Sequence, residues 1–182
     1  MTRRAAIIAS CAAMLALAVG ATAFVALMNS STGPTTTNAV GSASCSAPQL
    51  GGVKVDVTLS DVGDAMMSQA PMMATLTSDP TSVSAGKVSF VAFNNGALAH
   101  EMVVLPLPAD GSGTRQTGAN GKINEAQSLG EASRSCGAGT GDGIAPGSIG
   151  WTTMTLKPGR YELACDEPWH YAAGMFTALT VH

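Results

Sequence analysis

Short stretches of alternating apolar and polar residues, separated by glycine and proline turns, recur along this 182-residue chain. In "VKVDVTL" (53–59), valine or leucine occupies every second position. Side chains alternate between the two faces of a strand, so this pattern is typical of a strand with one buried face. Five further stretches are interpreted as strands: "KVSFVAF" (87–93), "HEMVVLPL" (100–107), "WTTMTL" (151–156), "RYELAC" (160–165) and "MFTALTV" (175–181). With no capped helical period among them, they predict an all-β Greek-key sandwich over residues 45–182.

The N-terminal 28 residues differ from this pattern. Arg3 and Arg4 precede an uncharged apolar run, residues 5–28, which as a helix of about 36 Å could cross a bilayer. Basic residues before an apolar run are typical of an export signal. We favour an uncleaved signal anchor, with a signal peptide cleaved after "ATA" (21–23) and lipidation of Cys11 as the alternatives.

Residues 29–44 are rich in Ser, Thr, Asn and Gly and are interpreted as a flexible linker. The folded domain is therefore expected outside the cytoplasm, either secreted or anchored to the cytoplasmic membrane. Two of the nine basic residues and none of the twelve acidic ones lie in the leader, so the exported part has a formal net charge of 7 − 12 = −5. This charge argues against nucleic-acid binding and suits a basic protein surface as partner.

Three cysteines are expected in the exported part, Cys45, Cys136 and Cys165, where thiols tend to oxidise. If Cys165 is a metal ligand, Cys45 and Cys136 can pair. That disulfide would close a loop of about 90 residues and stabilise the fold by ~4 kcal/mol on the chain-entropy model. Two free thiols, or acylation of Cys45, are the alternatives.

The stretch "CDEPWHYAAGM" (165–175) places a thiol, an imidazole and a thioether at spacings of five residues. Strand alternation puts Cys165 on the apolar face of its strand and therefore predicts that it points inward. Of the other two histidines, His182 ends the chain, whereas His100 opens a predicted strand. His100, Cys165, His170 and Met175 together match a trigonal copper site with an axial thioether.

These residues carry a resemblance to a known family. "YELACDEPWHYAAGM" (161–175) resembles the copper loop of cupredoxins, and His100 matches their upstream histidine. The Cys-x4-His-x4-Met spacing is closer to the rusticyanin and sulfocyanin-like subgroup than to the Cys-x2-His loops of plastocyanin-like proteins, and a weaker likeness extends over residues 79–107. The resemblance implies a β-sandwich that binds one copper ion, Cu(I)/Cu(II), and carries electrons between redox proteins, among them membrane-bound respiratory components.

The chain departs from the family at three positions. Trp169 stands where glycine is common, Glu101 where Asn or Ser is frequent, and Asp166 where Asn, Thr or Gln is usual. We expect Glu101, Asp166, Glu167 and Trp169 to act beside the metal or in docking. Asp166 and Glu167 are expected to form a solvated loop face, with a docking patch for a basic partner as the alternative. If ionised, they would favour Cu(II).

Two segments interrupt the strand pattern. Residues 108–150 are rich in glycine and serine, and such a long loop is unusual in a compact domain, so we expect short extra strands or a cover over the sandwich. The segment 64–76 holds four methionines between Met66 and Met73, which are interpreted as packing residues. The alternative for them, a second Cu(I) site, motivates a competing function in copper storage, delivery or tolerance.

A copper enzyme is disfavoured by the histidine count. Such enzymes need further imidazoles for a catalytic copper, and only His182 is left over. We therefore predict an electron carrier and not an enzyme.

Overall fold

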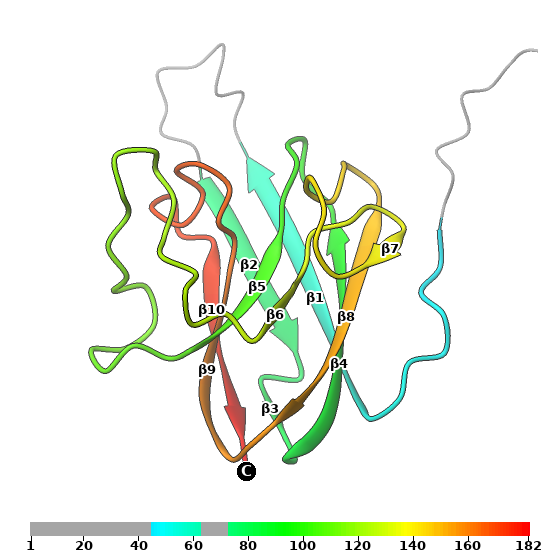
Figure 1. The fold of residues 1–182 in the computed structure, drawn as a ribbon. Helices are drawn as coiled ribbons and strands as arrows, with labels where there is room; N and C mark the ends of the chain where they lie inside the picture. Colours follow the sequence, from blue (N-terminus) through cyan, green and yellow to red (C-terminus); the bar gives the residue numbers. More distant parts are fainter. Residues whose placement is uncertain (1–44, 63–72) are drawn as a thin grey trace, which may run out of the picture. The chain divides into compact units, whose positions relative to one another are not determined.

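The computed structural model describes residues 45–62 and 73–182, and these form two five-stranded β-sheets packed face to face (Figure 1). The first sheet has the order β2-β1-β4-β8-β7, with β1 (Val53–Val62), β2 (Met73–Asp79), β4 (Gly86–Asn94), β7 (Gly137–Ala138) and β8 (Ile149–Leu156). The second has the order β3-β10-β9-β5-β6, with β3 (Ser82–Val83), β5 (Met102–Pro106), β6 (Gly130–Ala132), β9 (Gly159–Ala164) and β10 (Phe176–Val181). The predicted all-β sandwich is confirmed.

Both sheets are mixed. In the first, β1 pairs antiparallel with β2 but parallel with β4, in a register that runs from Val53 opposite Val88 to Leu59 opposite Asn94. In the second, β9 lies between β5 and β10 and is antiparallel to both. The parallel pair matters for the site, because it brings the carboxyl ends of β1 and β4 to the same end of the sandwich.

Each of the six predicted strands is present, and β2 is an additional one. It begins inside the methionine-rich segment 64–76, which obscured the alternation of buried Ala74 and Leu76 with exposed neighbours. Met73 is the first residue of β2, whereas Met66, Met67 and Met72 lie outside the described residues.

The core between the sheets is built from alternate positions, as the period-2 pattern requires. On β1 these are Val55, Val57 and Leu59, and on β9 they are Tyr161 and Leu163. Cys165 and Met175 belong to the same buried cluster. Two of the predicted metal ligands, Cys165 and Met175, therefore belong to the apolar core.

A second apolar cluster lies on the outer face of the second sheet. There Val103 and Leu105 of β5 pack with Ile123 of the long loop and with Tyr171. Glu162 of β9 is also buried on this face, where Arg115 forms an ion pair with it and Ser112 donates a hydrogen bond to it. Residues 108–150 thus do both things expected of them, since they cover the sandwich and contain β6 and β7.

A disulfide joins Cys45 to Cys136, with 5.4 Å between their Cα atoms, and Cys165 remains a buried free thiol. This is the pairing that the sequence predicted for a metal-binding Cys165. The predicted anchor (1–28) and the predicted linker (29–44) lie outside the described ranges. Among the residues that the structure describes, no helix has the length and apolar character needed to span a membrane.

Candidate metal centre

The four predicted ligands come together because β5 and β9 are neighbours. His100 lies two residues before β5 and Cys165 directly follows β9, so antiparallel pairing brings them to the same end of the second sheet. His170 and Met175 belong to the loop between β9 and β10. His100, Cys165 and Met175 are fully buried, and His170 is only 6% exposed.

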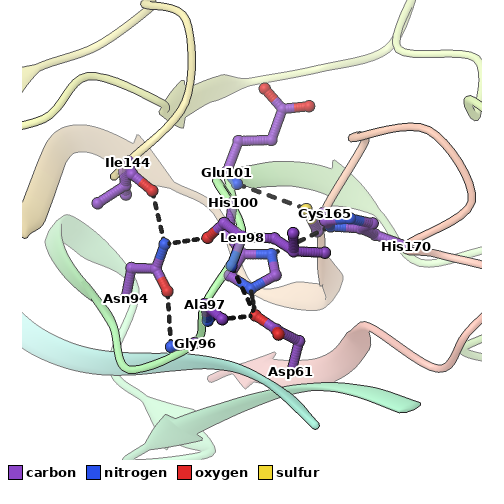
Figure 2. A network of polar contacts seen from close by, with 10 residues as sticks. All are labelled: Asp61, Asn94, Gly96, Ala97, Leu98, His100, Glu101, Ile144, Cys165 and His170. Carbon is purple, nitrogen blue, oxygen red and sulfur yellow. Dashed lines mark hydrogen bonds and ion pairs between the residues drawn. The ribbon is translucent and has the colours of Figure 1, made fainter. Parts of the chain in front are cut away.

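The donor atoms of three ligands converge. One nitrogen each of His100 and His170 and the sulfur of Cys165 all lie within 4.8 Å of one another. Nδ1 of His170 is 3.0 Å from Nδ1 of His100 and 3.5 Å from Sγ of Cys165 (Figure 2). Three donors that face one another in a buried space are arranged to bind a single metal ion.

Main-chain hydrogen bonds close the loop that carries the remaining ligands. The N–H of Cys165 donates to the carbonyl of Met175 at 3.0 Å, and the N–H of Met175 donates to the carbonyl of His170 at 3.1 Å. His170 in turn donates to the carbonyl of Glu167. The positions of these ligands are thus set by the backbone.

Glu101 contacts the site through its main chain. Its N–H donates to Sγ of Cys165 at 3.4 Å, while its carboxyl group points away from the sulfur (Figure 2). A Glu side chain in place of Asn or Ser therefore leaves this hydrogen bond intact, because any residue except proline supplies an N–H.

Sequence reasoning missed Asp61. Its Oδ1 accepts from Nε2 of His100 at 2.7 Å and from the N–H groups of Ala97 and Leu98 at 2.9 and 3.1 Å. The Asp61 side chain is only 1% exposed. A signal was present, since Asp61 continues the inward-facing series of β1 two residues beyond Leu59.

Asn94, at the end of β4, is a second residue near the site that the sequence did not predict. Its amide donates to the carbonyls of Leu98 and Ile144 at 2.7 and 2.6 Å, and its Oδ1 accepts from the N–H of Gly96 at 2.8 Å (Figure 2). These bonds shape the loop that leads into His100.

Burial controls the protonation of the ligands in the metal-free protein. It raises the pKa of the Cys165 thiol to about 12, although N–H donors oppose the shift, and it lowers the pKa of His170 to about 4 with help from nearby His100. Burial also tends to raise the pKa of Asp61, but the hydrogen bonds from Leu98, His100 and Ala97 outweigh it and the pKa is lowered. A metal ion must therefore displace a proton from Cys165 and finds His170 already neutral.

The carboxyl groups near the site are less exposed than the sequence suggested. Asp166 is 5% exposed and accepts from the N–H of Ile123, so the prediction of a solvated loop face is wrong for this residue, because the long loop covers it. Glu167 is half-buried. Glu101, Glu125 and Asp166 bring carboxylate oxygens within 4.8 Å of one another.

Burial and mutual repulsion raise the pKa values of these three carboxyl groups. The pKa of Glu101 is raised to about 8, mainly by burial and by Glu125, and that of Glu125 to about 7, mainly by burial and by Asp166. Burial also raises the pKa of Asp166. The raised pKa of Asp166 acts against the ionised form that a bias toward Cu(II) requires.

Trp169 adopts a backbone conformation that glycine favours, with a φ of 72°. Its N–H donates to the carbonyl of Gly121 at 2.9 Å, and its ring lies so close to Gly121 that a Cβ there would come within 2.6 Å of Cδ2. The side chain is nevertheless 56% exposed, directly beside the ligand His170.

The residues fit a copper ion. Imidazole suits both oxidation states of copper, whereas thiolate and thioether suit Cu(I). A structural zinc site would more often take only Cys and His. A two-sheet sandwich with two His, one Cys and one buried Met at one end is the arrangement of a cupredoxin, as the resemblance in sequence predicted.

Solved structures with similar folds include auracyanins and rusticyanin. Auracyanin B is 22% identical, covering 75% of this chain and 93% of its own, with a TM-score of 0.46. An auracyanin from Roseiflexus castenholzii is 16% identical, covering 72% and 99%, also with a TM-score of 0.46. Reduced rusticyanin is 22% identical, covering 73% of this chain and 82% of its own, with a TM-score of 0.42.

No protein-family model and no curated protein matches the sequence. The interpretation of the site therefore depends on the residues described above.

Proposed function

We propose that this chain is an extracytoplasmic mononuclear copper protein that carries single electrons between redox partners. The observation that carries the proposal is the convergence of the His100, Cys165 and His170 donor atoms in a buried space beside Met175. Copper, when bound, supplies a one-electron couple. The protein residues hold the ligands in place and exclude water.

The rigidity of the site favours electron transfer. The ligand loop is closed by its own main-chain hydrogen bonds, and His100 and Cys165 are tied to other buried groups. These hydrogen bonds restrict the movement of the ligands, so we expect little reorganisation to accompany the transfer. A delivery protein would instead need ligands that release the metal readily.

The remaining histidine supports a carrier over a copper enzyme. His182 follows β10 at the end opposite Met175, and its ring contacts Ser82 at 3.2 Å. It is thus unable to supply a ligand to the site.

Docking is proposed at the end of the sandwich that holds the ligands. Exposed Trp169 precedes His170, and exposed Leu98 lies two residues before His100. Apolar side chains next to buried ligands would let a redox protein, such as a membrane-bound respiratory component, approach without a hydrated gap. The disulfide supports an extracytoplasmic location, because disulfides persist in oxidising compartments.

Reconstitution with Cu(II) tests the proposal. Intense visible absorption and reversible one-electron voltammetry are expected from the full-length protein, and both should be lost in Cys165→Ser. A colourless protein that holds Cu(I) and exchanges it rapidly would instead indicate storage or delivery, the function that the methionine-rich segment motivates. Absorption that survives in Cys165→Ser would overturn the ligand assignment.

A further inference from the structure

Asp61 lies in a buried site formed by two separate segments. Its carboxylate comes from the end of β1, and its three donors, which belong to Ala97, Leu98 and His100, all come from the loop between β4 and β5. In the described part of the chain, His100 is the only side chain to which Asp61 is hydrogen-bonded. The negative charge of Asp61 thus lies next to a single imidazole ring, that of His100.

The hydrogen bond defines which His100 nitrogen carries a proton. An ionised carboxylate can only accept, so Nε2 must donate to Asp61. Nδ1 then keeps its lone pair, and this is the nitrogen that faces His170 and lies on the side of the other ligands.

Gly96 makes room for this contact. A Cβ at position 96 would come within 2.0 Å of Oδ1 of Asp61 and within 2.7 Å of Nε2 of His100. The N–H of Gly96 is meanwhile held by Asn94. The loop is therefore shaped around the bond between Asp61 and His100.

We propose that Asp61 is a positioning residue that holds His100 in its Nε2-protonated tautomer and places a negative charge behind the metal ligand. The inference rests on the copper site proposed above. A carboxylate on the second nitrogen makes an imidazole a better donor and favours the more highly charged metal state. Asp61 therefore favours Cu(II) over Cu(I) at the site and strengthens the binding of copper.

Two substitutions separate orientation from charge. In Asp61→Asn, the amide oxygen can accept the same three hydrogen bonds, all of which now end on Oδ1, but the charge is lost. In Asp61→Leu, both the acceptor and the charge are lost. Asp56→Asn is the matched control, because Asp56 lies on the same strand with an exposed side chain that pairs with Lys54.

The first measurement needs no copper. Nitrogen-15 NMR of the metal-free full-length protein should show His100 with a proton on Nε2 and none on Nδ1, in wild type and in Asp61→Asn. Asp61→Leu should lose this fixed tautomer. A wild-type His100 without a proton on Nε2 would overturn the proposal, whether or not the protein binds copper.

The second measurement is voltammetry of the copper-loaded protein. Asp61→Asn should lower the preference for Cu(II) over Cu(I) about tenfold, which raises the reduction potential by about 59 mV for a one-electron couple. Asp56→Asn should leave it unchanged. Equal potentials in the two Asn variants would contradict the proposed effect of the charge.

Copper retention against a chelator provides the third readout. Asp61→Leu should bind copper 10–100-fold more weakly. If that variant does not fold, Gly96→Ala replaces it, because the added methyl group displaces the same bond. Wild-type retention in a folded Asp61→Leu or Gly96→Ala would count against the positioning role. Absence of a reversible couple in the wild type would refute the proposed function but would leave the NMR result to decide the role of Asp61.

Discussion

The main-chain N–H of Glu101 donates to Sγ of Cys165 at 3.4 Å, although the two residues are 64 positions apart in the chain. The bond links the segment of one ligand, His100, to the sulfur of another. It exists because β5 and β9 are adjacent antiparallel strands.

Replacing Glu101 by proline should lower the reduction potential. Proline has no N–H, and a hydrogen bond to the sulfur stabilises the reduced site by drawing electron density from the thiolate. Voltammetry of the copper-loaded protein measures the change. Glu101→Gln keeps the N–H and is the control, so a potential in Glu101→Pro equal to that of Glu101→Gln would contradict this role for the bond.

Met175→Leu should change the site without unfolding the protein. Leucine has nearly the volume of methionine, so the free energy of unfolding should fall by less than about 1.5 kcal/mol. The visible spectrum and the potential should nevertheless change, since the axial ligand tunes both. Met102→Leu is a matched control, because Met102 is also fully buried in the core. If the two variants have the same spectrum, Met175 is not a ligand.

Trp169→Gly should be more stable than Trp169→Ala by about 1 kcal/mol. Both variants lose the ring, but only alanine retains the cost of a positive φ. Urea unfolding of the two variants measures the difference. A difference near zero would mean that the loop relaxes to a negative φ once the indole no longer packs on Gly121.

Glu125→Gln should make the metal-free protein more stable than wild type, by an amount that increases as the pH rises from 4.5 to 7. Folding raises the pKa of Glu125 from 4.5 to about 7, mainly through burial and through Asp166, with Glu131 adding to the shift and Lys122 opposing it. Between these two values the folded state binds a proton that the unfolded state has lost. The free energy of unfolding therefore falls as the pH rises through this window.

Glu125→Gln has no carboxyl group at this position, so its free energy of unfolding should not fall in this way. Below pH 4.5 the substitution should have little effect. Above pH 7 it should stabilise the protein by about 1 kcal/mol, which is less than the full pKa shift implies because solvent screens a half-buried group. Urea unfolding at several pH values measures the difference between wild type and variant. Asp110→Asn, at an exposed loop position, is the control for the general effect of removing one carboxyl group. A flat difference for Glu125→Gln would show that the carboxyl group is ionised in the folded protein.

The local alternation of apolar and polar residues was enough to predict many features of this protein. Period-2 alternation predicted six strands and the inward direction of Cys165, because the two faces of a strand follow directly from residue order. The ligand set also followed from the sequence, since so few Cys and His are present that their types and spacing left a single grouping.

Tertiary structure decided what lies around those ligands. Asp61 reaches His100 because β1 and β4 are parallel neighbours, which brings the end of one strand beside the loop that follows the other. Asp166 is buried because the 108–150 loop covers it. Contacts of this kind depend on the order of strands in a sheet and on the path of a long loop. Neither is encoded in the alternation of neighbouring residues, so the sequence predicted the metal ligands but not the groups that hold them.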